Sequence, residues 1–244
     1  MDLDGLTILN GIFSIIFCSI GIILGTRIVV KYLRYRRSEL FYFSISAFFI
    51  VSPWYPSAIS FIVALFNSGV GIPAQLYYFL GLFFPPISIF TWLIVFSDLV
   101  IEKQKKIILS LWAIFGVIFE VLLSILLIYD YNLIGNYNPF IDPINVRYSD
   151  IMIFSLGLMT IITVSTGFIF GRESYKSQIP ETRLKGLFVS LGFLLYAIGG
   201  LIDFLIPLNA LTLTVARTFL IACGFSFYIG IIAPEWAKNL LIKQ

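Results

Sequence analysis

The 244-residue sequence contains no histidine, which removes the commonest metal ligand and the commonest general acid–base group of proteins. It contains two cysteines, Cys18 and Cys223, and each lies within an apolar run, so no extracellular disulfide framework is expected. No Gly-rich phosphate loop, CxxC pair or Ser/His/Asp set is present. We therefore predict no metal site, no cofactor and no enzymatic activity.

Charged residues are also scarce, at 12% of the chain, whereas soluble domains carry about 25%. Hydrophobic residues make up 59%, and the mean hydropathy is +1.00. A membrane-spanning helix needs about 20 mostly apolar residues. Seven runs meet this requirement, at roughly 7–30, 40–67, 75–100, 107–129, 150–171, 186–206 and 211–233. We predict one all-α domain, a seven-helix bundle that is a multi-pass protein of the cell membrane.

The basic residues fall almost entirely on one side of the predicted membrane. Short loops with such a bias face the cytoplasm, so we predict that the N-terminus lies outside and the C-terminus inside. The net charge of +3 then reflects topology and does not indicate a nucleic-acid partner. Fourteen of the sixteen lysines and arginines share the inner side: Arg27, Lys31, Arg34, Arg36, Arg37, Lys103, Lys105, Lys106, Arg172, Lys176, Arg183, Lys185, Lys238 and Lys243.

A second use of these bases is a docking site for anionic lipid or for a cytoplasmic signalling partner. The stretch "KYLRYRR" after the first span is the densest basic segment, and a second basic segment precedes the fourth span. The candidates for such a site are Arg34, Arg36, Arg37, Lys105 and Lys106.

The order of features along the chain resembles that of a known family. After "KYLRYRR", the third span contains "YYFLGLFFPPISIFTWLIVFSD", and "ETRLKGLFVSLGFLLYAIGGLIDFL" follows as the sixth span. Over roughly residues 10–235, this order resembles the seven-helix N-terminal sensor module of some prokaryotic membrane histidine kinases. The resemblance implies a sensor or receptor bundle that signals through a separate partner. We expect no kinase activity, because only "EWAKNLLIKQ" follows the last span.

Prolines inside the second and third spans predict helix breaks. Pro53 and Pro56 lie in "SPWYPS", and Pro85 and Pro86 lie in "LFFPPISIF". An internal proline removes a backbone hydrogen bond and kinks the helix. Two roles are open for these breaks. They only give the bundle its shape, or they act as hinges and open a cavity.

Small and polar residues form stripes on four spans. At spacings of three and four they permit close helix packing, so these faces should point into the bundle. The stripes are Gly192, Tyr196, Gly199, Gly200 and Asp203; Trp112, Gly116, Glu120 and Ser124; Thr160, Thr163 and Gly167; and Thr214, Arg217, Gly224 and Tyr228. The aromatic candidates for lining a ligand cavity are Trp92, Tyr196 and Tyr228.

Glu120 lies near the middle of the fourth span. An ionisable group at that depth costs about 2.5–3.5 kcal/mol on insertion scales and is a candidate functional residue. Because no base lies at its depth, we predict a neutral carboxyl that donates a hydrogen bond to the threonines of the fifth span. Two roles are open for Glu120. It acts as a proton-linked switch or anchors a ligand, or it forms a hydrogen bond that fixes the packing of two helices.

Asp203 and Arg217 lie near the outer ends of the last two spans. The connection 207–210 is short, so the two helices should be antiparallel neighbours. At 1.5 Å per residue, Asp203 lies about 6 Å and Arg217 about 10 Å below the turn, which an arginine side chain can bridge. An ion pair is one prediction. The alternatives are that Arg217 reaches alone to the headgroups, or that it binds an anionic ligand.

The segment 130–149, "DYNLIGNYNPFIDPINVRYS", is the one sizeable outer connection. It either anchors aromatic side chains at the membrane interface or folds as a lid over the outer mouth of the bundle.

Taken together, these features favour a sensor or receptor-like protein that binds a small molecule or lipid in a cavity opening outward between the third and seventh spans. A SWEET-like small-molecule transporter and a structural membrane protein without a ligand are the alternatives. The sequence does not indicate the oligomeric state.

Overall fold

The computed structural model describes residues 3–207 and 209–241 and is an all-α bundle. The helices are α1 (Gly5–Tyr35), α2 (Ser38–Phe49), α3 (Tyr55–Phe66), α4 (Ala74–Leu82), α5 (Pro85–Val100), α6 (Lys105–Tyr129), α7 (Asp150–Tyr175), α8 (Pro180–Leu205), α9 (Ala210–Phe227) and α10 (Glu235–Leu241). Short helical turns are η1 (Ser52–Trp54), η2 (Glu102–Gln104), η3 (Tyr131–Leu133) and the π-helical turn η4 (Tyr228–Ile232). Two short strands are β1 (Gly135–Asn136) and β2 (Arg147–Tyr148).

Within residues 3–207 and 209–241, seven helical segments are long and apolar enough to cross a membrane, as the sequence predicts. They are Gly5–Tyr35, Ser38–Phe66, Ala74–Val100, Glu102–Tyr129, Asp150–Tyr175, Pro180–Asp203 and Ala210–Ile232. Several helices run past the predicted apolar runs. The sixth span begins at Pro180 and not near residue 186, because Pro180 and Glu181 are both favourable in a first helical turn. The predicted inner-side base Lys243 lies outside the described residues.

The predicted proline breaks are confirmed in the second and third spans. The second span is divided into α2, η1 and α3, with Pro53 within η1 and Pro56 in the first turn of α3. Pro85 begins α5 after the break from α4. Neighbouring side chains bond backbone carbonyls near these breaks: Trp112 Nε1 donates to the carbonyl of Pro86 at 2.9 Å. At the other break, the Tyr55 hydroxyl donates to the carbonyl of Phe48 at the end of α2. Side chains thus bond a backbone carbonyl beside each break.

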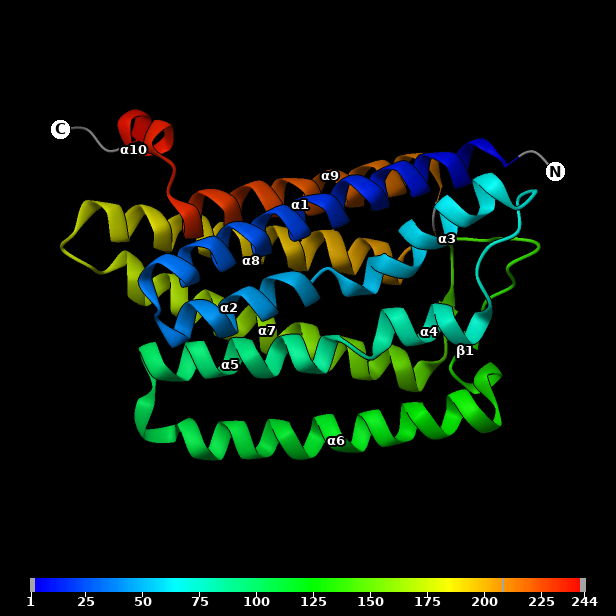
Figure 1. Ribbon diagram of the computed structural model, residues 1–244, viewed down its shortest axis with the longest axis horizontal. Coiled ribbons are helices and arrows are strands. Elements are labelled where there is room, and N and C mark those ends of the chain that lie inside the picture. Colours follow the sequence, from blue (N-terminus) through cyan, green and yellow to red (C-terminus); the bar gives the residue numbers. More distant parts are fainter. Residues whose placement is uncertain (1–2, 208, 242–244) are drawn as a thin grey trace.

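The spans form a ring with one helix at its edge. Contacts run from α1 to α2, then to α5, α7, α8 and α9, and back to α1. α6 packs mainly on α5 and lies along the edge of the bundle (Figure 1). Its outward face is a continuous apolar surface suited to lipid. The exposed side chains of that face are Ile107, Leu111, Ile114, Val117, Ile118, Val121, Ile125 and Ile128.

Glycines bring α7 and α8 into close contact. A Cβ built on Gly186 would lie 2.5 Å from the carbonyl oxygen of Gly171 and 2.5 Å from the nitrogen of Tyr175. On the other face of α8, Gly192 and Gly199 leave room for side chains of α9. Gly200, which we predicted on the same packing stripe, differs, because a Cβ added there would meet no atom within 4 Å. It lies beside the interface because helical residues one position apart point about 100° away from each other.

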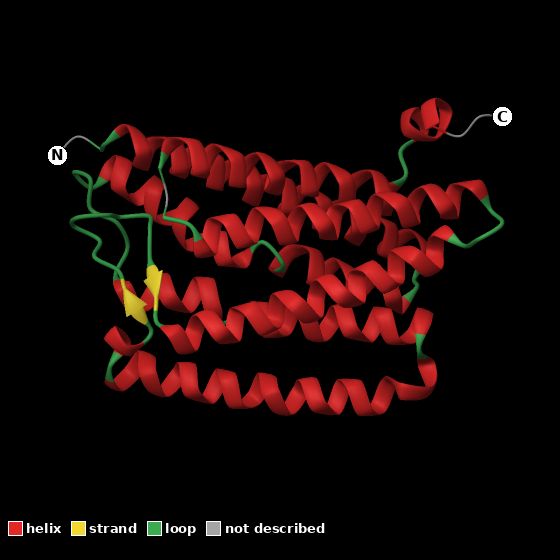
Figure 2. Ribbon diagram, turned by 180° about the vertical axis from the view of Figure 1, so that it is seen from behind, coloured by secondary structure: helices red, strands yellow, loops and turns green. Residues whose placement is uncertain are grey.

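The two ends of the bundle differ. One end holds the start of α1, the α8–α9 turn and the hairpin of β1 and β2, in which Gly135 pairs with Tyr148 and Asn136 with Arg147 (Figure 2). We call it the hairpin end. The other end holds the α1–α2, α5–α6 and α7–α8 connections together with α10, and we call it the α10 end (Figure 1).

We predict that Gly186→Ala destabilises the bundle by about 1–3 kcal/mol, because the added methyl group meets backbone atoms that cannot move aside. Gly200→Ala in the same helix is the matched control. Its Cβ meets nothing, and alanine favours a helix by up to about 1 kcal/mol over glycine. Thermal unfolding in detergent should therefore show a lower midpoint for Gly186→Ala and an equal or higher one for Gly200→Ala. Equal midpoints for the two variants would contradict the close α7–α8 contact.

Candidate functional site

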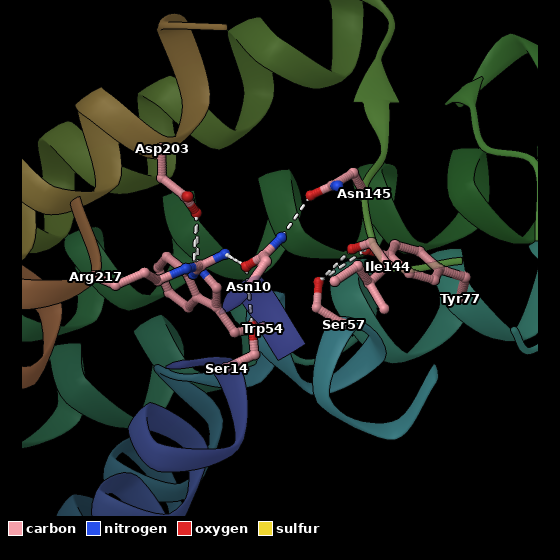
Figure 3. A network of polar contacts seen from close by, with 9 residues as sticks. All are labelled: Asn10, Ser14, Trp54, Ser57, Tyr77, Ile144, Asn145, Asp203 and Arg217. Carbon is pink, nitrogen blue, oxygen red and sulfur yellow. Dashed lines mark hydrogen bonds and ion pairs between the residues drawn. The ribbon is translucent and has the colours of Figure 1, made fainter. Parts of the chain in front are cut away.

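Arg217 on α9 and Asp203 on α8 form an ion pair near the hairpin end, with 3.2 Å between Nη1 and Oδ2 (Figure 3). The Arg217 side chain is 3% exposed and that of Asp203 is 15% exposed. The helices meet here because α9 begins directly after the turn, where the Asn209 side chain accepts bonds from the nitrogens of Leu211 and Thr212. The predicted pairing of the acid and the base is confirmed.

A chain of amides connects this pair to α1 and to the connection 130–149. Arg217 Nη2 donates to Oδ1 of Asn10 at 2.7 Å, and Nδ2 of Asn10 donates to Oδ1 of Asn145. Asn145 in turn donates to the carboxylate of Asp142 at 2.9 and 3.0 Å. Asn10 is 1% exposed, and Ser14 one turn further donates to its Oδ1. A continuous polar path thus runs from α9 through α1 to the segment before β2.

Trp54 completes the cluster from the second span. Its Nε1 donates to Oδ2 of Asp203 at 2.7 Å, and its ring centroid lies 6.0 Å from the guanidinium carbon of Arg217. The ring therefore offers the cation a favourable face while its N–H holds the anion. We call Asn10, Trp54, Asn145, Asp203 and Arg217 the Arg217 cluster.

The Arg217 cluster keeps unused hydrogen-bonding capacity. A guanidinium has five N–H donors, yet within the described residues neither Nε nor Nη1 of Arg217 has a hydrogen-bond partner beyond the ion-pair contact of Nη1. Oδ1 of Asp203 also lacks one there. Buried polar atoms without partners are unfavourable, so the cluster is suited to accept another polar group.

Serines and tyrosines hold the connection 130–149 against the helices. Ser57 and Tyr77 both donate to the carbonyl of Ile144, at 2.9 and 2.6 Å. The Tyr137 hydroxyl lies 3.0 Å from Ser60 Oγ, and its ring stacks on Tyr77 with 4.0 Å between centroids. Burial raises the pKa of Tyr137 to about 12, so its hydroxyl is neutral and able to donate. The connection therefore folds over the hairpin end instead of extending into solvent.

An apolar cavity of about 20 Å³ lies on the α10 side of the cluster, between α1, α2, α8 and α9. Phe17 and Tyr196 line it and both pack against Trp54, with ring centroids 5.0 and 6.1 Å away. This volume is about that of one water, and the lining is apolar. We expected a cavity between the third and seventh spans. This one is bordered by α8 and α9 of the sixth and seventh spans, but α1 and α2 take the place of the third to fifth spans in its wall.

The structure does not bring the predicted aromatic candidates together. Tyr196 lies beside Trp54 and so borders the Arg217 cluster. Trp92 instead donates to Oγ1 of Thr166 at 2.8 Å and packs against Phe193. Tyr228 begins the π-helical turn η4 towards the α10 end.

Glu120 lies away from the Arg217 cluster, on the edge helix α6. Within the described residues neither of its carboxyl oxygens has a hydrogen-bond partner, although both are buried. The predicted bond to the fifth span is wrong, because Thr160 and Thr163 donate to the carbonyls of Leu156 and Met159 in their own helix. α6 packs mainly on α5, with a smaller contact to α4 of the same span.

The five basic candidates all lie at the α10 end. Arg34 lies over the ring of Tyr35, Arg36 caps α1 with a φ of 55°, and Arg37 pairs with Glu39 at 3.5 Å. Lys105 pairs with Asp98, and Lys106 is exposed. They are spread over two connections and form no single pocket.

Sequence reasoning missed Asn10, Trp54 and Asn145. The signal for Asn10 was available, because it is the single amide side chain in the first apolar run. Trp54 and Asn145 lie in irregular segments whose position depends on tertiary packing, and no spacing rule connects them to Arg217.

We predict that Tyr137→Phe destabilises the hairpin end by about 1–3 kcal/mol, because it removes the buried hydroxyl that lies 3.1 and 2.8 Å from the carbonyls of Ile72 and Pro143 and donates there. Tyr129→Phe is the control, since Tyr129 is 83% exposed. Faster amide hydrogen exchange across residues 134–146 is expected for Tyr137→Phe alone. Unchanged exchange would show that the hydroxyl does not hold the connection.

We further predict that Asp203→Asn lowers the free energy of unfolding by about 3–5 kcal/mol, because it leaves the buried Arg217 cation without its anion. Asp150→Asn at the exposed start of α7 removes an acid from the same end and should change stability by no more than about 0.5 kcal/mol. Denaturation of the two purified variants in the same detergent measures the difference. A similar loss in both variants would refute a special role for the pair.

Neither a protein-family model nor a curated protein sequence matches this chain. The function must therefore be argued from the Arg217 cluster and its surroundings.

Proposed function

We propose that the protein is a receptor-like membrane sensor whose ligand carries a small anionic group and binds at Arg217. One observation carries this proposal: Arg217 is a buried cation with unused donors, placed between three spans and the outer connection. Buried charges inside membrane spans mark functional sites by default. The predominance of basic residues at the α10 end supports an orientation with the hairpin end outside.

The Arg217–Asp203 contact provides a two-state element. A ligand carboxylate or phosphate that reaches Nε and Nη1 competes with Asp203 for the guanidinium. Asp203 is the more exposed partner and lies close to the end of α8, so it can move toward water when it is displaced. The anion of the pair, and not the cation, is therefore the mobile member.

Displacement of Asp203 from Arg217 would affect several elements at once. Asp203 also holds Trp54, and Arg217 holds Asn10, which is bonded to Asn145 of the outer connection. A ligand that replaces Asp203 would loosen the second span and shift α8 against α9. Both helices continue to the α10 end, where the inner connections would present the change to a cytoplasmic partner.

The test uses formate, acetate and inorganic phosphate as probes of the Arg217 cluster. We predict that formate raises the unfolding temperature of the intact chain and raises that of Asp203→Asn more, because formate then has no competing carboxylate. The double variant D203N/R217Q removes both charges together and should lose the response. Arg147→Gln removes an exposed base at the same end and should keep it.

Two outcomes would contradict the proposal. Equal responses in the parental chain and in D203N/R217Q would mean that the anions bind elsewhere. Uptake of radiolabelled formate into proteoliposomes would mean that the protein is a transporter and not a sensor. A sensor should instead show formate-dependent changes in amide exchange at residues 176–179, on the far end of the bundle, without any flux.

A further inference from the structure

The short helix α10 lies across the spans and not along them. In Figure 1 the spans run horizontally, whereas α10 is seen nearly end-on. It lies at the same end of the bundle as the α7–α8 connection. A helix in this position lies in the plane that a membrane surface would occupy. Its orientation is independent of the Arg217 cluster, which lies at the other end of the bundle.

The backbone between α9 and α10 explains the change of direction. The last span ends in the π-helical turn η4, and Ala233 then adopts a left-handed conformation with a φ of 48°. Pro234 follows and cannot continue the hydrogen-bond ladder. Lys31 Nζ on α1 donates to the carbonyl of Ile232 at 2.9 Å, which satisfies a carbonyl that the broken helix leaves free.

The two sides of α10 have different surroundings. Ala237 is fully buried against the bundle, and Lys238 lies 4.0 Å from the carboxylate of Glu181 at the start of α8. Away from the bundle, Trp236 is 56% exposed and Leu240 is 74% exposed. These two side chains are four positions apart and so share one helical face. An exposed tryptophan and leucine on a helix at the end of the spans suit the interface between headgroups and acyl chains.

Charge indicates which lipid this face meets. Among the described residues, the α10 end carries thirteen bases and six acids, so it is strongly positive and attracts anionic headgroups. The bases are Arg27, Lys31, Arg34, Arg36, Arg37, Lys103, Lys105, Lys106, Arg172, Lys176, Arg183, Lys185 and Lys238, and the acids are Glu39, Asp98, Glu102, Glu173, Glu181 and Glu235.

We propose that α10 is a membrane-surface anchor, and that Trp236 and Leu240 insert into the headgroup–acyl boundary of a leaflet rich in anionic lipid. Through Lys31 and Glu181 the anchor fixes the ends of α1, α8 and α9 at a defined depth. The last span is thereby held at its inner end by lipid and at its outer end by the Arg217 cluster.

Tryptophan fluorescence of the full chain in lipid nanodiscs tests this anchor. Trp54, Trp92 and Trp112 are at most 7% exposed, so Trp236 is the tryptophan that lipid or water can reach. Subtracting the spectrum of Trp236→Phe isolates its emission. Phosphatidylcholine brominated near the glycerol should quench this emission more than lipid brominated near the chain end, and aqueous iodide should quench it little. Adding phosphatidylglycerol should increase quenching by the shallow bromines.

Leu240→Glu should shift Trp236 emission to the red and reduce bromine quenching, because it places a charge in the inserted face. Asn239→Glu adds the same charge to the neighbouring exposed position and should leave the quenching unchanged. Strong iodide quenching in the parental chain would place α10 in water and overturn the proposal. Protection from both quenchers would overturn it as well, since protein would then cover the face. Insensitivity to phosphatidylglycerol would overturn the preference for anionic lipid.

Discussion

The requirement that a buried cation be surrounded by polar partners organises the hairpin end of this bundle. Arg217 lies among apolar spans, where an unpaired charge is unfavourable by several kcal/mol. Its partners come from different parts of the chain: Asp203 from α8, Asn10 from α1 and Trp54 from the break in the second span. The positions of these elements relative to one another are therefore fixed by one guanidinium. The connection 130–149 is held in turn, because Asn145 accepts a hydrogen bond from Asn10.

In the interior away from this cluster, close packing of small residues holds helices together. Gly171 and Gly186 allow α7 and α8 to touch through their backbones, and the prolines divide two spans so that they can bend around the core. Small residues at contacts are the usual means of packing in lipid, where apolar burial between helices provides little driving force. α6 lacks such close contacts with the ring beyond α5, and its outer face is left to lipid.

The sequence predicted the parts of this structure that depend on local pattern. Seven apolar runs and two pairs of prolines were sufficient to predict the spans and the breaks. The short connection 207–210 made the Asp203–Arg217 pair one of three predictions, and the structure shows that pair. The errors arose where the answer depends on which helices are neighbours. Glu120 was assigned to the threonines of the fifth span, but α6 packs on α5 and α4, and neither Glu120 carboxyl oxygen has a hydrogen-bond partner among the described residues. Trp54 and Asn145 were missed for the same reason, since periodicity within one helix carries no information about a partner that lies far away along the chain.

The same long separation has a consequence for biosynthesis. Asn10 and Arg217 are 207 positions apart. At about 5–20 residues per second, Asn10 waits on the order of ten to forty seconds for its partner after it enters the membrane. Until then Asn10 and Trp54 have no cation to surround. The last span therefore completes assembly, and a chain interrupted before Arg217 would leave the polar groups of Asn10 and Trp54 without the cation that they surround.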